Sequence, residues 1–330
     1  MRHAPLFASL LLVACSSSGD DVAGPKATPS STGDPAAPPP AAADDTWADG
    51  KTVSGKVTIP AGSTVTIAQG ASIAVASGAS ITVQGKLVAS GGKIGGATWK
   101  GIVVAAGGDA ELDALDVSGA DVALDVSGTA TFSNAAIAGT PFRVEKGGKL
   151  TASHVKVTAP DASTDVYGAF TASYLTYDEN DQHAIMAKDP SATVSIEDST
   201  FSNSGRLGAS AGPDVLTVEQ AASFHIAYSD VSGAHCGFHF TGGDAISIDH
   251  VTVHDITNAA DVWGSAPSGK HTITASNFEK ALGVAFDESG TNGAFAVTGC
   301  YVQGTNNLAS PSQITIASPA SAAIADAHPR

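Results

Sequence analysis

Five of the ten histidines lie within one short stretch, and imidazole is both a frequent metal ligand and a general acid or base. They are His225, His235, His239, His250 and His254. The pairs His235/His239 and His250/His254 have a spacing of four, which brings two ligands together only on a helix. Because this stretch has the alternation of strands and turns, we predict no metal site here. His239, between two phenylalanines, should point away from the core.

A second group of residues with chemical potential is acidic. Asp178, Glu179 and Asp181 form one carboxylate-rich turn, and Arg206 lies in a long insertion between residues 202 and 214. Clustered carboxylates suit Ca²⁺, and two carboxylates flanking the scissile bond are the minimum for hydrolysing a glycoside. Neither a calcium-loop framework nor a paired-Asp motif accompanies them, so no cofactor is expected. These four residues are catalytic candidates only under an enzymatic alternative.

The overall charge excludes several classes of partner. The chain has 330 residues with 16 basic and 32 acidic side chains, for a formal net charge of −16. It lacks the basic surface that nucleic acid or anionic lipid would need. No apolar run approaches the roughly 20 residues of a membrane-spanning helix. Few charged residues and 36 glycines favour β-structure with tight turns.

The first residues have the layout of an export signal. A short basic start precedes an apolar run over 6–13 and a small residue, Ala14, before Cys15. The tetrapeptide LVAC at 12–15 resembles the lipobox of bacterial lipoproteins. This resemblance implies a signal peptide over 1–14 and lipidation of Cys15 by palmitate-type chains. Ser16 then favours the outer membrane. An ordinary signal peptide with a chance cysteine is the alternative.

Residues 15–46 are rich in Ser, Ala, Gly and Pro and lack hydrophobic periodicity. Such a composition predicts a disordered tether between the lipid and a folded domain.

The remainder of the chain is repetitive. An eight-residue unit recurs as VTIPAGST, VTIAQGAS and IAVASGAS from residue 57, so three units predict one triangular coil. From residue 101 the period is 20, with GIVVAAGG, DVALDVSG and PFRVEKGG aligned without gaps. Apolar residues five positions apart recur in nine coils. These pairs are Leu112/Val117, Phe132/Ile137, Ala152/Val157, Ala172/Tyr177, Ile196/Phe201, Ile226/Val231, Ile248/Val253, Ile273/Phe278 and Val297/Val302.

Short β-branched strands at a nearly constant period predict an all-β solenoid. The "PAGSTVTI" units and Trp99-Lys100-Gly101-Ile102 before a Gly-Gly turn resemble the pectin-lyase-like superfamily. The resemblance implies a single-stranded right-handed parallel β-helix of roughly 11–12 coils over 47–325, followed by a tail over 326–330. A β-sandwich is the alternative. Trp47 would cover the first coil, whereas the last coil has a weakly specified cap.

The apolar pairs also align the positions between them. One inward position holds Cys300, which lies about three coils from Cys236, so we predict two reduced, buried thiols rather than a disulfide. One outward position gives five consecutive polar or aromatic residues, hereafter the outward column. Its members are His154, Tyr174, Asp198, Tyr228 and His250. Such a column can bind sugar rings, or its rings can stack simply for stability.

The sequence therefore favours a non-enzymatic, lipid-anchored envelope protein whose lateral face binds a glycan or a surface protein. A polysaccharide lyase or glycoside hydrolase on the same scaffold is one alternative. A structural protein that stacks end to end is another.

Overall fold

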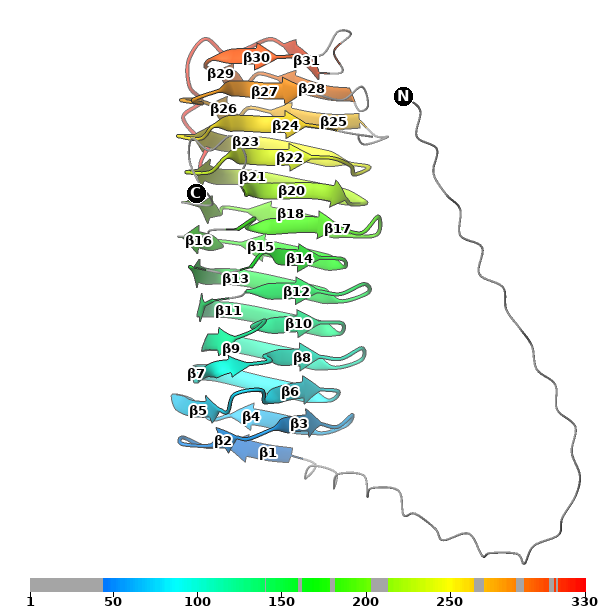
Figure 1. The fold of residues 1–330 in the computed structure, drawn as a ribbon, viewed down its shortest axis with the longest axis vertical. Helices are drawn as coiled ribbons and strands as arrows, with labels where there is room; N and C mark the ends of the chain where they lie inside the picture. The colour runs from blue at the N-terminus through cyan, green and yellow to red at the C-terminus, as the bar shows by residue number, and fades with distance from the viewer. Residues whose placement is uncertain are drawn as a thin grey trace, which may run out of the picture. The chain divides into compact units, whose positions relative to one another are not determined.

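The computed structural model describes residues 44–139, 141–159, 162–178, 182–202, 213–263, 270–288, 294–308, 312 and 314–330. Contacts divide the chain at residue 39, and the described residues all belong to the second unit. This unit is an all-β parallel solenoid of about eleven turns, without a helix among its described residues. Figure 1 shows the coils stacked in chain order. The predicted fold class and number of coils are thereby confirmed, while right-handed winding stays a prediction.

Two parallel sheets build the solenoid, and each coil contributes to both. The small sheet has twelve strands: β3 (Lys56–Ile59), β6 (Ser80–Val83), β8 (Ile102–Val104), β10 (Leu124–Val126), β12 (Phe142–Val144), β14 (Thr164–Val166), β17 (Ile185–Lys188), β20 (Asp214–Gln220), β22 (Cys236–Phe240), β24 (Asn258–Val262), β27 (Val284–Glu288) and β30 (Thr305–Asn307).

The large sheet has nineteen strands: β1 (Asp44–Trp47), β2 (Thr52–Val53), β4 (Thr64–Ile67), β5 (Ala71–Val75), β7 (Lys86–Trp99), β9 (Asp109–Ala120), β11 (Thr129–Ala138), β13 (Lys149–Thr158), β15 (Ala169–Ser173), β16 (Thr176–Asp178), β18 (Thr193–Glu197), β19 (Thr200–Phe201), β21 (Ser223–Ser232), β23 (Ile246–His254), β25 (Lys270–Thr274), β26 (Asn277–Phe278), β28 (Ala294–Thr298), β29 (Tyr301–Val302) and β31 (Ile314–Ala317).

Strand register confirms how the sequence aligns the coils. Val57 of the first eight-residue unit pairs with Ile81 of the fourth, so three units close one coil as predicted. The apolar pairs also lie in register, as in Phe132 beside Leu112 and Ile137 beside Val117. This stacking of like residues buries a continuous apolar core along the solenoid.

The gap-free 20-residue alignment is wrong in one place. It holds in the large sheet, where Thr129 pairs with Asp109. In the small sheet, however, Val126 pairs with Val104 and with Val144, so β10 is shifted by two residues. A two-residue shift keeps each side chain on the same face of the sheet. The core therefore tolerates it, and only the lengths of the flanking turns change.

Each coil of the large sheet bends at a corner between the two apolar residues of its pair. The corner residues from Ala114 to Ala275 have φ values between 45° and 54°. Positive φ is uncommon for residues with a side chain, and one such residue between two extended segments bends the chain. The five residues of the outward column are all corner residues, so the bend determines where their side chains project.

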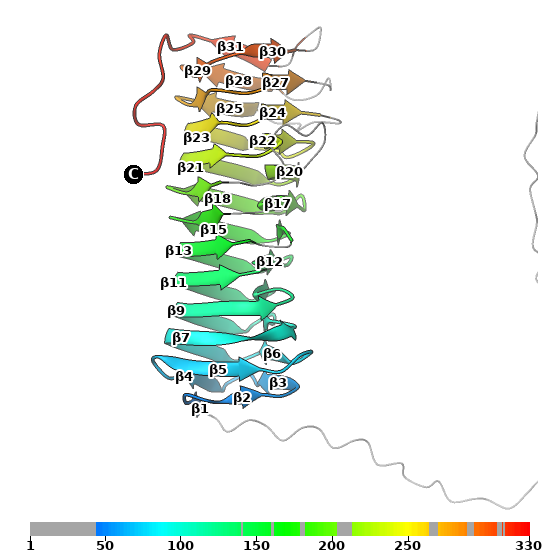
Figure 2. The same ribbon diagram turned by 60° about the vertical axis from the view of Figure 1, so that its left-hand side comes forward.

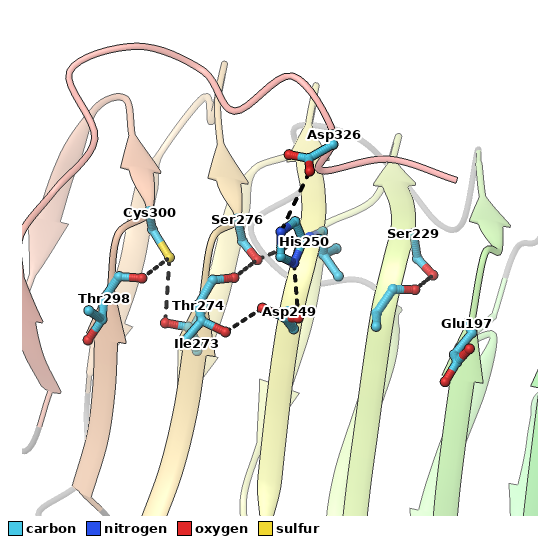
Figure 3. A network of polar contacts seen from close by, with 12 residues as sticks. Glu197, Ser229, Asp249, His250, Ile273, Thr274, Ser276, Thr298, Cys300 and Asp326 are labelled. Carbon is cyan, nitrogen blue, oxygen red and sulfur yellow. Dashed lines mark hydrogen bonds and ion pairs between the residues drawn. The ribbon is translucent and has the colours of Figure 1, made fainter. Parts of the chain in front are cut away.

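The inward position beside each corner is buried in every coil, as predicted. Three of the residues at this position are serines, and each serine hydroxyl accepts a hydrogen bond from a buried backbone N–H of the preceding coil. Ser276 Oγ accepts the Val251 N–H at 3.1 Å and donates to the Thr274 carbonyl at 2.7 Å (Figure 3). Cys300 occupies the same position, and both Cys236 and Cys300 are buried free thiols. The predicted absence of a disulfide between them is confirmed.

The described residues also include no helix long and apolar enough to cross a membrane.

Trp47 is 2% exposed and packs within the first coil. At the other end, the last strand finishes at Ala317, earlier than the expected limit of 325. Residues 318–330 then run back beside the stack to the level of β21 (Figure 2). This segment is hereafter the tail.

Candidate functional site

The outward column forms two stacked ring pairs with a carboxylate between them. The rings of His154 and Tyr174 are 4.4 Å apart with an interplanar angle of 23°. The rings of Tyr228 and His250 are 4.8 Å apart with an angle of 19°. Both distances are close to the spacing of about 4.8 Å between neighbouring parallel strands. The residues of the outward column therefore lie above one another in successive coils, as predicted.

The tail covers the second half of this column. Arg330 forms a two-point ion pair with Asp198, at 2.9 and 3.1 Å, and its guanidinium lies 3.8 Å from the centre of the Tyr228 ring. Asp198 is only 7% exposed as a result. The hydrogen bonds from Arg330 hold the pKa of the Asp198 carboxyl below its ordinary value. The half of the column around Asp198 thus binds the chain itself.

Further contacts hold the tail along the large sheet. The side-chain amide of Asn277 donates to the Ile324 carbonyl at 2.9 Å and accepts the Ile324 N–H at 2.7 Å. Thr252 Oγ1 donates to the carbonyl of Ala327. Asp326 lies 3.9 Å from Nε2 of His250 (Figure 3).

The first half of the column is open. Tyr174 is 42% exposed and is one of the few large hydrophobic side chains exposed among the described residues. Polar groups surround its stack with His154: Ser153 Oγ is 3.0 Å from Nδ1 of His154, and Ser173 donates to Ser153 at 3.2 Å. An exposed ring with hydroxyl groups beside it can bind the apolar face of a sugar and its hydroxyls together.

Of the four residues proposed for the enzymatic alternative, Asp178 lies in the part of the chain that the structure describes. Asp178, at the end of β16, accepts a hydrogen bond from Ser202 at 3.1 Å and lies 3.8 Å from Nζ of Lys156. Glu179, Asp181 and Arg206 lie outside the described residues, as does the lipidation candidate Cys15.

A different group of ionisable side chains, hereafter the polar cluster, comes from four neighbouring small-sheet strands, β17, β20, β22 and β24, or from the residues just before them. Its members are His183, Asp214, His235, Cys236, His239 and Asp261. Asp214 is 4% exposed and accepts a hydrogen bond from Nδ1 of His239 at 2.6 Å. His235 Nδ1 lies 3.5 Å from Asp214, and Cys236 Sγ lies 2.9 Å from Asp261.

Strand register explains how these residues meet. Asp214 and Cys236 are paired first residues of β20 and β22, and His239 pairs with Asp261 further along β22 and β24. His183 precedes β17, and its Nδ1 accepts the Asp214 N–H at 3.0 Å. His239, which was predicted to point away from the core, is partly exposed between two buried phenylalanines, and its ring also contacts Asp214.

The cluster strongly alters the acidity of its members. Burial disfavours ionisation of Asp214, yet the hydrogen bond and charge of His239 lower its pKa. The same hydrogen bond to Asp214 raises the pKa of His239. Burial, with the charges of Asp214 and Asp261, strongly raises the pKa of the Cys236 thiol. Burial also raises the pKa of Asp261. Cys236 is therefore a protonated thiol here and a poor nucleophile.

The sequence analysis missed this cluster because it aligned coils only on the apolar pairs of the large sheet. The spacing of residues within the histidine-rich stretch does not predict that His235 or Cys236 contacts Asp214, which lies one coil earlier. Aligning the small-sheet strands would have placed Asp214 beside Cys236. That alignment is hidden by the two-residue shift at β10 and by the insertion before β20.

No protein-family model, no curated protein and no solved structure matches this chain. The likenesses to bacterial lipoproteins and to the pectin-lyase-like superfamily therefore rest on the sequence features alone.

Proposed function

We propose that this chain is an exported, lipid-anchored solenoid of the pectin-lyase-like type that binds a glycan, without cleaving it, on its lateral face. The observation that carries the proposal is the exposed stack of Tyr174 on His154, with serine hydroxyls beside it. An aromatic ring of this kind packs against the apolar face of a sugar ring, while neighbouring hydroxyls bind its hydroxyl groups.

The position of the stack supports this proposal. Tyr174 lies at a corner of the large sheet, where neighbouring coils present further polar groups in register. Asn134 and Ser133, one coil below His154, both donate to Asp113 at 2.7 Å. A linear glycan could lie along this face and contact several coils.

The lipid anchor is a separate part of the proposal, since it rests on LVAC at 12–15. Attachment at Cys15 would hold the solenoid at the bacterial envelope, with residues 16–46 as a spacer. Metabolic labelling with a radioactive fatty acid tests it: label should enter the wild-type chain and not the Cys15→Ser variant. Equal labelling of both would overturn the anchor.

The test of binding is a glycan-array screen with the wild-type chain and Tyr174→Ala. We expect retention on a subset of glycans, a loss of at least about tenfold in Tyr174→Ala, and no new reducing or unsaturated ends. Tyr167→Ala is the matched control, because Tyr167 is partly exposed and lies outside the stacked pairs of the described residues. Product formation would favour the lyase or hydrolase alternative. No retention would overturn glycan binding and direct attention to a protein partner.

A further inference from the structure

The donor atoms of the polar cluster converge in the way that metal ligands do. One atom each of Asp214, His235 and Cys236 lies within 4.8 Å of the other two. Cys236 Sγ is 3.1 Å from His235 Nδ1, which is 3.5 Å from Asp214 Oδ1. Ligands of tetrahedral zinc are about 3.3–3.7 Å apart, because Zn–N and Zn–O are about 2.0 Å and Zn–S about 2.3 Å. The three atoms therefore approximate one face of a coordination tetrahedron.

An independent observation is that the surrounding polar atoms are incompletely satisfied. Asp261 is 2% exposed, and its Oδ1 has no hydrogen-bond partner in the described part of the chain. Its other oxygen accepts the Cys236 thiol at 2.9 Å, so this carboxyl group is directed at the cluster. Nε2 of His239 is likewise buried and unpartnered among those residues. Buried polar atoms without partners are costly and rare in proteins, and they commonly mark a missing ligand.

The chemistry of the donor set selects the kind of ion. One sulfur, one imidazole nitrogen and one carboxylate oxygen suit a borderline cation such as Zn²⁺, whereas Ca²⁺ and Mg²⁺ require mainly oxygen. A dication would also balance the charges of a Cys236 thiolate and the Asp214 carboxylate in this buried position. We propose that the polar cluster is a binding site for zinc or a similar transition-metal dication, with Asp214, His235 and Cys236 as its ligands.

Two neighbours would support these ligands. His239 donates Nδ1–H to Asp214 Oδ2 at 2.6 Å, which orients the carboxylate so that Oδ1 faces His235. Asp261 Oδ2, 2.9 Å from Cys236 Sγ, lies directly beside the sulfur ligand. Second-layer contacts of this kind fix ligand orientation, and their loss lowers metal affinity by about 10- to 100-fold. The site departs from the sequence-based expectation of no metal and is independent of the proposed glycan face.

The test is cobalt and zinc titration of the purified full-length chain after chelator treatment. We expect one equivalent of Co²⁺ to give tetrahedral visible bands and a thiolate charge-transfer band in the near ultraviolet. Zinc should displace the cobalt, raise the melting temperature and release about one proton per ion from the Cys236 thiol. His239→Gln should bind zinc about 10- to 100-fold more weakly.

Cys236→Ser should lose the charge-transfer band, whereas Cys300→Ser should retain it. Cys300 is the matched control because it is the other buried free thiol. Circular dichroism checks that each variant folds. If Cys236→Ser does not fold, His235→Gln tests the site instead, because His235 is partly exposed. A wild-type chain that binds no zinc, or a band that is unchanged in Cys236→Ser and His235→Gln, would overturn the proposal. Cobalt binding without a thiolate band would overturn it too.

Discussion

Arg330 and Asp198 are 132 positions apart in the chain, yet Nε and Nη2 of the arginine donate to the two oxygens of Asp198, at 2.9 and 3.1 Å. The same guanidinium stacks on Tyr228, so one residue joins two coils of the outward column. This contact means that the column has two different halves. One half binds the tail, and the other presents Tyr174 and His154 to solvent.

The tail contact predicts a local change in Arg330→Ala. Amide hydrogens of residues 326–330 should exchange about tenfold faster, because the charge-assisted hydrogen bonds and the cation–π contact are lost. The Ile324 amide should remain protected, since Asn277 still accepts its hydrogen bond. Hydrogen-exchange mass spectrometry measures both. Arg143→Ala, which removes a surface arginine elsewhere, is the control, and unchanged tail exchange in Arg330→Ala would contradict the contact.

Acid should release the same contact. The folded pKa of Asp198 lies below its ordinary value of 3.8, so its ion pair is intact above that value and is lost as pH falls through the folded pKa. The protection of the tail amides, taken relative to their intrinsic exchange rate at each pH, should therefore persist until the pH is below about 3.8 and then fall. A loss of protection already near neutral pH would show that another group controls the tail.

His254 predicts a loss of stability in the alkaline range. Its hydrogen bonds to Asp230 and Asp255 raise its pKa from 6.5 to about 9. A raised pKa stabilises the fold fully below 6.5, and this contribution is lost as pH rises through about 9. The wild type should lose about 2 kcal/mol of unfolding free energy between about pH 6 and pH 10. This loss is smaller than the whole pKa shift would give, because solvent weakens the interaction of His254 with the exposed Asp255.

Urea unfolding at these two pH values measures the effect. His254→Gln should remove most of the pH dependence, whereas His328→Gln, at an exposed position in the tail, should retain it. Parallel curves for wild type and His254→Gln would show that the imidazolium contributes nothing.

The inward serines predict a measurable cost for losing one hydroxyl. Ser276→Ala leaves the buried N–H of Val251 without its acceptor and should lower the unfolding free energy by about 1–3 kcal/mol. Cys300→Ser, at the equivalent position of the next coil, should change stability by less than about 1 kcal/mol, because serine recurs there in other coils. Chemical unfolding of both variants checks this, and equal losses would argue against the hydroxyl's role.

Gly101 predicts a steric limit on how closely two coils approach. A Cβ atom at Gly101 would lie 1.7 Å from the Val122 carbonyl oxygen of the next coil, and φ is +95°. Gly101→Ala should therefore cost clearly more than about 1 kcal/mol. Gly107 has a φ of +82° and open space around it, so Gly107→Ala measures the cost of the backbone conformation alone. Similar melting temperatures for the two variants would contradict the clash.

Much of the architecture follows from the sequence. Apolar residues five positions apart, such as Phe132 and Ile137, must both face inward when the chain bends between them. Their recurrence therefore predicts the coils, the alignment of the outward column and the burial of Cys300. A repeat determines these features because each coil can bury its apolar residues only against a similar neighbour.

Other features were decided by the tertiary structure. The register of β10 depends on turn lengths, which a two-residue shift can change without moving a side chain to the other face. The tail reaches Asp198 through a contact that has no counterpart in the repeat. Asp214 meets His235, Cys236 and His239 because parallel coils lie about 4.8 Å apart, whatever the length of the loop between them. Sequence spacing cannot express that proximity, since the insertion before Asp214 changes the count of residues but not the distance between coils.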